Sequence, residues 1–184
     1  MLPEQDRQTL LGMARAAVRH GLQHRRVLTV SVTEYSPALQ QQGASFVTLK
    51  IRDELRGCIG TLTAHQPLIQ DIAENAYNAA FRDPRFPELS VGEFDQLDVH
   101  VSVLTPPQPM TFVDEQDLLG QLQPRVDGLV LSDGALRGTF LPSVWESLQD
   151  RQDFLRHLKM KAGLPPDYWS STLRVARYRV EAFS

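Results

Sequence analysis

The sequence predicts an α+β fold that is mainly antiparallel sheet flanked by helices. Residues 97–103 (Leu-Asp-Val-His-Val-Ser-Val) alternate strictly between apolar and polar side chains. Half-polar strands are typical of antiparallel sheets, because buried parallel strands have continuous apolar runs. An Asp-Gly pair between two β-prone runs over 127–141 predicts a hairpin, which also joins antiparallel strands. Helical and strand-like segments follow one another along the chain without an internal repeat.

Five segments have helical periodicity. Residues 4–21 place apolar side chains at three- and four-residue spacing, and Gly21 marks the expected end. Residues 67–82 do the same with many small side chains, which indicates close packing. Pro84 must end this helix, because proline disfavours helical backbone at the residue before it. Shorter helices are predicted over 114–122, 143–149 and 150–162.

The remaining segments are predicted as strands and loops. Residues 45–51 form a strand, and residues 55–61 follow it across a short Arg-Asp-Glu turn as a return strand or loop. Residues 37–43 are polar and Gln-rich, which predicts a loop. Residues 173–183 alternate apolar with charged side chains, so we expect one strand with a wet face.

Composition excludes several classes of protein. A net charge of −3 argues against a general nucleic-acid binder, which usually carries a basic stripe or tail. No apolar run approaches the roughly 20 residues of a membrane span, and the N-terminus has no signal-peptide pattern. One cysteine cannot form an internal disulfide, so nothing requires an oxidising compartment. These features predict a cytoplasmic protein that has no membrane partner.

The most informative stretch is Leu55-Arg-Gly-Cys-Ile-Gly60. It holds the only cysteine, between two glycines and two residues after an arginine. Glycine allows a tight backbone turn and the close approach of another group. A neighbouring cation favours the thiolate, which is the nucleophilic form of cysteine. The stretch therefore predicts an anion pocket, a nucleophile, or both.

With the threonine that follows, this stretch is similar to the signature of the AMMECR family, called in bacteria the AmmeMemoRadiSam system protein A. The resemblance continues in the right order along about residues 7–183. Further blocks that resemble the family lie at 80–87, 101–105, 126–129, 137–142, 159–164 and 178–181.

The resemblance implies one AMMECR-type domain over residues 1–184, built as two closely packed, intertwined lobes. It implies that the cysteine motif lies near the cleft between the lobes. It also implies that the gene lies near genes for a Memo-like protein and a radical SAM protein. These two proteins are therefore candidate partners. It implies no settled activity and no cofactor.

Cys58 is the candidate catalytic residue. A nucleophilic thiol needs exposure, a positive field and usually a base. Arg56 supplies a positive charge, and His65 and His100 are the available bases. The alternative is that Cys58 is a small buried hydrophobe, since free cysteine is among the most buried residue types.

Arginines concentrate in the family-like blocks, together with glycines. Guanidinium groups that converge with glycine N–H groups bind carboxylate or phosphate. The alternative is a structural network of salt bridges with Asp53, Glu54, Asp83 and Glu88, in which Asp83 caps or buttresses the turn. The predicted ligand-binding set is Arg56, Gly57, Gly60, Arg82, Asp83 and Arg85, and Arg137 is a further family-block arginine.

Other chemistry is weakly represented. The histidines are scattered, and only His20 and His24 have a ligand-like spacing, so no metal site is predicted. Lys159 and Lys161 are interpreted as favourable charge near a helix end. Trp145, Tyr168 and Trp169 are interpreted as core or lobe-interface residues.

Two functional hypotheses follow. The first is a protein that binds an anionic small molecule or peptide group in a cleft around Gly57–Gly60 and Arg82–Phe86, with chemistry at Cys58. The second is a non-enzymatic adaptor or regulator that docks a protein partner, in which Cys58 is structural.

Overall fold

The computed structural model describes residues 1–184, which form two compact units. Unit 1 comprises Met1–Leu104 and Glu181–Ser184, and unit 2 comprises Thr105–Val180. Both units combine helices with an antiparallel sheet, so the predicted α+β class is confirmed. None of the helices has the length and apolar character needed to cross a membrane.

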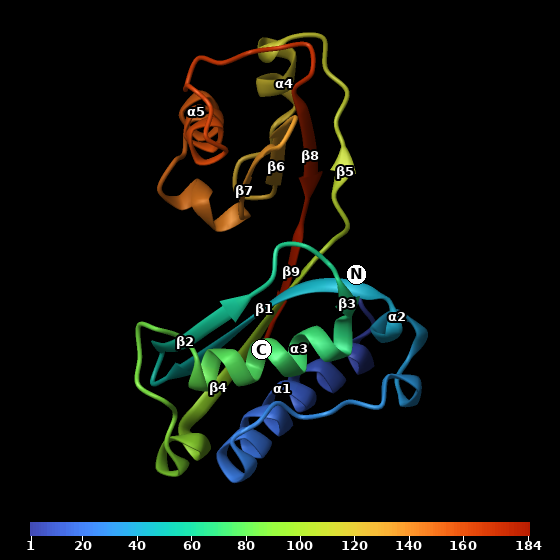
Figure 1. Cartoon of the computed structure of the whole chain (residues 1–184), viewed down its shortest axis with the longest axis vertical. Helices are drawn as coiled ribbons and strands as arrows, with labels where there is room; N and C mark the ends of the chain where they lie inside the picture. Colours follow the sequence, from blue (N-terminus) through green and yellow to red (C-terminus); the bar gives the residue numbers. More distant parts are fainter. The chain divides into compact units, whose positions relative to one another are not determined.

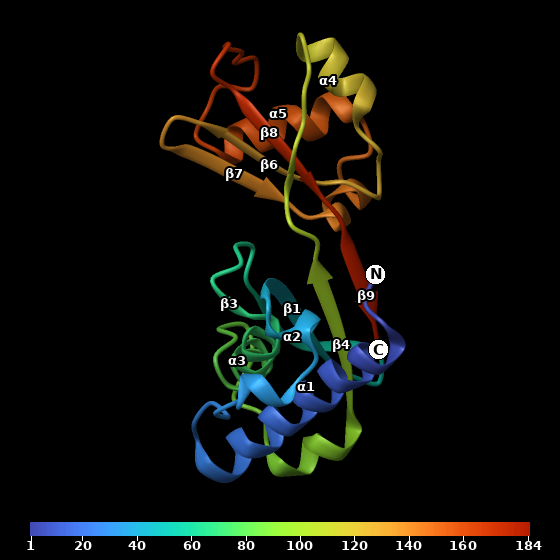
Figure 2. The ribbon, with the colours of Figure 1, turned by 90° about the vertical axis from the view of Figure 1, so that its right-hand side faces the viewer.

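Unit 1 is a sheet in the order β2-β1-β4-β9, with the short β3 paired to the start of β1. The helices α1 and α3 pack against each other on one face of this sheet (Figures 1 and 2). Its elements are α1 (Glu4–His24), α2 (Pro37–Gln40), β1 (Gln42–Ile51), β2 (Glu54–Gly60), β3 (Gln66–Pro67), α3 (Leu68–Phe81), β4 (Leu97–Leu104) and β9 (Val180–Phe183), with 3-10 turns η1 (Val32–Glu34) and η2 (Val91–Gln96).

The period-two pattern of β4 explains why one face of the sheet is buried. Val99 and Val101 lie opposite Leu49 and Val47 of β1, and all four belong to the core beneath α1 and α3. The alternate residues of β4, such as His100, are therefore on the opposite face. The sheet of unit 1 thus has a helix-covered face and an open, largely polar face.

The β1–β2 hairpin closes through two residues. Ile51 pairs with Glu54, and Arg52 and Asp53 between them have φ angles of 52° and 65°. Two consecutive positive φ angles define a type I′ turn, whose twist matches that of the strands. Residues 54–60 form a strand, which confirms the first of the two alternatives predicted for 55–61, and the glycines of the motif make no tight turn.

A buried polar cluster joins α3 to the ends of β1 and β2. Asp71 is fully buried, and it accepts hydrogen bonds from Ser45 Oγ at 2.5 Å, Thr61 Oγ1 at 2.7 Å and Asn75 Nδ2 at 2.9 Å. Burial raises the pKa of Asp71, and the hydrogen bonds from Ser45 and Thr61 oppose this effect. The donors supply partners to a carboxyl group that would otherwise be costly to bury.

Unit 2 has a second sheet in the order β5-β8-β6-β7. Trp145 stacks on Phe154 with ring centroids 3.7 Å apart, and both side chains are fully buried in its core. Tyr168 and Trp169 pack against this core. The elements of unit 2 are β5 (Gln108–Pro109), α4 (Glu115–Gln121), β6 (Gly128–Asp133), β7 (Leu136–Phe140), η3 (Pro142–Glu146), α5 (Arg151–Lys161) and β8 (Arg174–Tyr178).

Several predicted boundaries differ from the observed ones. Residues 37–43 hold the short helix α2 and the start of β1 instead of a loop, and residues 143–149 contain only a 3-10 turn. The hairpin of unit 2 turns at Gly134-Ala135, because Asp133 is already paired with Leu136.

Residues 173–183, predicted as one strand, form two strands in the structure. The break is at Arg179, so that β8 belongs to the sheet of unit 2 and β9 to that of unit 1. The expected alternation with one wet face is not kept, because Val175 and Tyr178 are buried while Ala182 is exposed. Tyr178 instead covers Gly128 and donates a hydrogen bond to the Phe140 carbonyl at 2.9 Å.

Lys159 is also not a surface charge. Its side chain is fully buried, and its Nζ donates to Glu115 Oε1 at 2.8 Å while it lies 5.6 Å from the centre of the Trp169 ring. The ion pair and the ring face compensate for the desolvation of the ammonium group.

Candidate functional site around Cys58

Cys58 lies on β2, one of the two edge strands of the unit 1 sheet. It pairs with Thr48, which in turn pairs with His100 of β4. The three side chains therefore form one row on the open face, with Thr48 in the middle. The thiol is half-buried, and the Thr48 hydroxyl donates a hydrogen bond to Cys58 Sγ at 3.1 Å.

The register separates the two candidate bases. His100 shares the row with Cys58, one strand beyond Thr48. His65 lies after the end of β2, where its Nδ1 is 3.2 Å from the Thr63 carbonyl. His100 is therefore the histidine that the sheet aligns with the thiol.

Asp83 and Arg85 bind the backbone of Cys58 from the outer side of β2. Asp83 Oδ2 accepts the Cys58 N–H at 2.9 Å, and Arg85 Nη2 donates to the Cys58 carbonyl at 3.2 Å. Arg85 also donates to Asp83, with Nη2 at 2.7 Å from Oδ2 and Nε at 2.9 Å from Oδ1. The pair thus occupies the hydrogen-bonding groups that an adjacent strand would use.

The two members of this pair differ in exposure. The Asp83 side chain is 1% exposed, whereas that of Arg85 is 54% exposed. Hydrogen bonds from Arg85, together with the Cys58 N–H, hold the pKa of Asp83 well below its usual range. Arg85 donates to Asp83 and to the Cys58 carbonyl through Nε and Nη2, and its Nη1 makes neither of these contacts.

Arg56 pairs with Glu93 instead of the predicted acidic residues. Arg56 Nε donates to Glu93 Oε1 at 2.7 Å, and Nη2 lies 3.3 Å from the Glu88 carbonyl. The hydrogen bond from Arg56 is the main reason that the pKa of Glu93 falls to about 2. The Arg56 side chain is 11% exposed, and its buried Nη1 has no hydrogen-bond partner in the protein.

The fold brings two of the predicted arginines together and places the other two elsewhere. Arg56 and Arg85 lie over the same ring, that of Phe86, at 5.9 Å and 5.5 Å. Arg82 is exposed and lies 5.2 Å from the centre of the Tyr77 ring on α3. Arg137 is on β7 in unit 2. Of the four family-block arginines, the fold therefore brings Arg56 and Arg85 together.

Both glycines of the motif lie where a side chain has no room. A Cβ at Gly57 would lie 2.1 Å from the backbone carbonyl oxygen of Ala79 on α3. A Cβ at Gly60 would lie 2.3 Å from the Phe46 ring. The expected close approach is therefore real, and the approaching groups belong to the protein itself.

Two pockets of unit 1 border this region. One, of about 490 Å³, is lined by Arg56 and Glu93 together with the β1–β2 turn. The other, of about 530 Å³, lies between α1 and β4 and reaches His100. No three His, Cys, Asp or Glu side chains are grouped to hold a metal ion, and the rings of His20 and His24 lie 4.4 Å apart without a third ligand.

Sequence reasoning missed three residues of the region. Thr48 contacts the thiol, and Glu93 binds Arg56. Asp71 is the buried carboxyl group on α3 that accepts a hydrogen bond from Ser45 of β1. The Ser90-to-Glu93 spacing is a capping-box pattern and could have indicated Glu93, whose carboxylate accepts the Ser90 N–H at 2.8 Å. No local pattern marks Thr48, because its role depends on strand register.

Comparison of this chain with known proteins identifies its family. The AMMECR1 family model matches residues 11–183. The chain belongs to the AMMECR1 family.

Individual relatives support this assignment. A protein of Methanothermobacter thermautotrophicus is 38% identical over 184 residues, covering 99% of this chain and 95% of the relative. Protein MJ0810 of Methanocaldococcus jannaschii is 35% identical over 174 residues, covering 92% and 85%. The crystal structure of the uncharacterized protein PH0010 from Pyrococcus horikoshii has a TM-score of 0.76 and 33% identity, covering 95% of this chain and 88% of that one.

Proposed function

We propose that the Cys58 region binds the anionic group of a small molecule or peptide, and that the Cys58 thiol is the reactive group of the site. One observation carries this proposal. The Thr48 hydroxyl donates to Cys58 Sγ at 3.1 Å, while Arg85 is held at the Cys58 backbone by Asp83.

The Thr48 hydroxyl fixes the position of the sulfur, and the guanidinium group of Arg85 lies at the backbone of the same residue. The thiolate is the nucleophilic form of cysteine. A half-buried sulfur on an open sheet face can still meet an electrophilic group of a bound molecule.

Two guanidinium groups supply the positive charge for an anion. Arg85 is half exposed, and its Nη1 is free of the bonds that hold Nε and Nη2. Arg56 lines the pocket of about 490 Å³, and its buried Nη1 has no acceptor within the protein. A carboxylate or phosphate oxygen is the acceptor that such donors bind most strongly.

We further propose that this site serves a modification pathway together with a Memo-like protein and a radical SAM protein. The basis of this part is the resemblance of the Leu55–Thr61 signature to the AmmeMemoRadiSam system protein A.

An adaptor function is the second candidate, and a specific observation favours it. Arg56, Arg82 and Arg85 each already contact a side chain of the protein, namely Glu93, Tyr77 and Asp83. The motif glycines are likewise explained by internal packing. In this case the signature stabilises the fold, and the open sheet face docks a protein.

Alkylation of Cys58 by iodoacetamide at pH 7 separates the two candidates. We expect the native thiol to react faster than the same thiol in denaturant. Thr48→Val, which keeps the side-chain shape, should slow the reaction several-fold, because a lost hydrogen bond is about 1 kcal/mol. Ser102→Ala, on the same face but opposite Phe46, is the matched control and should not change the rate. A thiol that reacts only after unfolding would refute the reactive-thiol proposal and leave the adaptor.

Inorganic phosphate tests the anion site. We expect phosphate to protect Cys58 from alkylation in the native protein and to lose this effect in the double variant Arg56→Ala, Arg85→Ala. Circular dichroism must show that the variant is folded at the assay temperature. Equal protection in the double variant would remove both arginines from the site.

A further inference from the structure

We infer that the outer edge of β4, where it extends past β9, binds an extended peptide segment of another protein as an added β-strand. The segment would lie in the groove between α1 and β4, and it would carry basic side chains on one side and apolar and acidic side chains on the other. This inference does not depend on Cys58 or on the proposed anion site.

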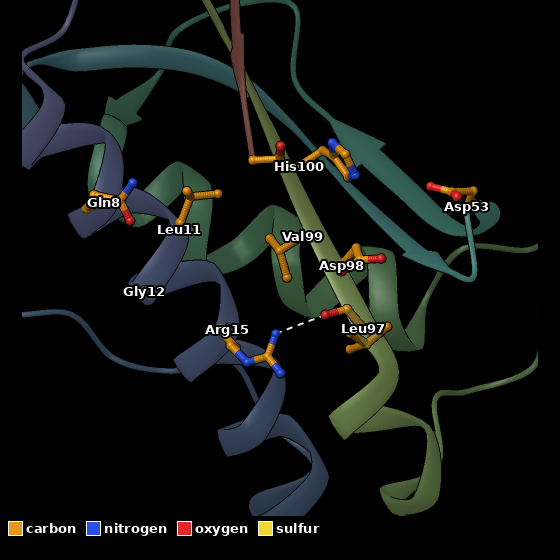
Figure 3. A pocket seen from close by; sticks show the side chains of 10 residues that line it. Gln8, Leu11, Gly12, Arg15, Asp53, Leu97, Asp98, Val99 and His100 are labelled. Atoms are coloured by element: carbon orange, nitrogen blue, oxygen red, sulfur yellow. Dashed lines mark hydrogen bonds between the residues drawn. The ribbon is translucent and has the colours of Figure 1, made fainter.

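The groove is the pocket of about 530 Å³ (Figure 3). Gln8, Leu11, Gly12 and Arg15 of α1 form one wall. The first residues of β4 lie along the other side, with Asp98 beyond them and Asp53 on the neighbouring β1–β2 turn. The groove therefore runs along a strand edge and has a helix as its second wall.

The edge of β4 is unpaired in this groove. The strand β9 follows β4 from the contact in which the Thr105 N–H donates to the Arg179 carbonyl at 2.9 Å. It ends at Phe183, and Ser184 lines the groove together with His100. The first residues of β4, from Leu97 to Val99, thus extend beyond the partner strand.

Backbone groups at this edge point into the groove. Arg15 Nη1 donates to the Leu97 carbonyl at 2.9 Å, which shows that this carbonyl is directed toward α1 and not toward β1 (Figure 3). Backbone groups two residues apart in a strand point the same way, so the Val99 N–H and C=O face the groove as well. An added strand forms its hydrogen bonds with such a pair.

Gly12 leaves space for a second chain. It lies in the middle of the 21-residue helix α1, where glycine is about 1 kcal/mol less favourable than alanine. A Cβ at this position would meet nothing within 4 Å, so no group of the protein requires the glycine. A helix wall without a side chain next to an open strand edge is what a backbone in the groove needs.

The side chains on the two sides of the groove indicate which residues the bound peptide should carry. Successive side chains of a strand point to opposite faces, so a peptide paired with β4 presents alternate residues to α1 and to the open face. On the open-face side they meet Asp98 and Asp53, which favour lysine or arginine. On the α1 side they meet Leu11 and Arg15, which favour an apolar and an acidic side chain.

A fluorescein-labelled peptide Thr-Lys-Val-Lys-Glu-Lys-Thr, acetylated and amidated, tests the inference by fluorescence anisotropy with the full chain. We expect it to bind, and to slow the exchange of the Val99 amide hydrogen measured by NMR. The peptide Thr-Lys-Pro-Lys-Glu-Lys-Thr keeps all charges but lacks one edge N–H group. It should bind about fivefold more weakly, because a hydrogen bond is about 1 kcal/mol.

Two variants of α1 complete the test. Gly12→Leu should abolish binding while the helix stays folded, because leucine is a strong helix former and would fill the groove. Ala16→Leu, one helical turn away and outside the groove lining, should bind as the native protein does. Equal binding of the two peptides, an unprotected Val99 amide, or full binding by Gly12→Leu would each overturn the inference.

Discussion

The sheet of unit 1 has two outer edges, and they are closed to different degrees. At Cys58 on β2, a carboxylate accepts the backbone N–H and a guanidinium group donates to the carbonyl. At the start of β4, one guanidinium group, that of Arg15, donates to the Leu97 carbonyl. The first edge has both of its hydrogen-bonding groups occupied, whereas the second has only one group covered.

This difference shows how side chains can end a sheet. An uncovered edge is a template for pairing with another chain, so proteins usually cover or charge it. The Asp83–Arg85 pair covers the β2 edge with groups from the loop that follows α3, and Gly57 lets α3 approach the same strand. The β4 edge has no such cover, and we expect the two edges to respond differently to substitution.

The largest effect should come from Gly57→Ala. Its Cβ would lie 2.1 Å from the Ala79 carbonyl oxygen, which is backbone and cannot move alone. We expect the free energy of unfolding to fall by about 3 kcal/mol, the range of severe overpacking. Urea denaturation measures the loss. Gly12→Ala on α1 is the matched control and should raise stability by up to about 1 kcal/mol; similar losses at both positions would contradict the packing argument.

Asp83→Asn should have the next largest effect. It leaves the Arg85 guanidinium without its anion and weakens the contact with the Cys58 N–H. We expect a loss of about 2 kcal/mol at pH 7, because a charged hydrogen bond is about that strong.

The same variant should remove a pH dependence. The pKa of Asp83 is lowered in the folded state, so its contribution is complete above the unfolded value of about 3.9 and is lost as the pH falls below it. The difference between native protein and Asp83→Asn should therefore be constant from pH 7 to pH 5 and shrink toward pH 3. A difference that grows on acidification would contradict this assignment.

Arg15→Ala should have a smaller effect, because solvent can replace the guanidinium group at the open β4 edge. We expect a loss of about 1 kcal/mol from the hydrogen bond to Leu97 and the contact of Arg15 with the Phe94 ring, whose centre is 5.1 Å away. Thermal unfolding measures it. A loss larger than that of Asp83→Asn would mean that the β4 edge is the more tightly closed of the two.

Arg52→Asn should have the smallest effect and the opposite sign. Arg52 has a φ of 52°, a left-handed conformation that asparagine tolerates better than arginine. We expect stability to rise by about 0.5 kcal/mol in urea denaturation. Lys50→Asn, two residues earlier within β1, keeps an extended backbone and should not stabilise the protein.

Much of the architecture follows from local patterns. The alternation of residues 97–103 predicted β4 and its buried face, and helical spacing predicted α1 and α3 to within a few residues. Gly57 was expected to allow close approach, which it does toward Ala79. The strand and helix assignments depend on residues that are close in sequence, so they can be predicted from local patterns.

Contacts between distant residues were not predictable in the same way. Whether Thr48 or another residue faces Cys58 depends on register, since a shift by one residue turns every side chain to the other face. The hydrogen bond of Asp83 to Cys58 joins residues 25 positions apart. The burial of Lys159 depends on Glu115, 44 positions away. A single sequence contains no sign of these pairings.

The split of the last strand has a consequence for the order of synthesis. Glu181 on β9 accepts hydrogen bonds from the Leu2 N–H at 3.0 Å and lies 2.7 Å from Arg7 Nη2, so the end of the chain is bound to its beginning. Unit 2, which ends at Val180, leaves the ribosome before the final residues of β9 do. Unit 1 is therefore built from two distant parts of the chain, and β9 can pair with β4 only after the whole of unit 2 has been synthesised.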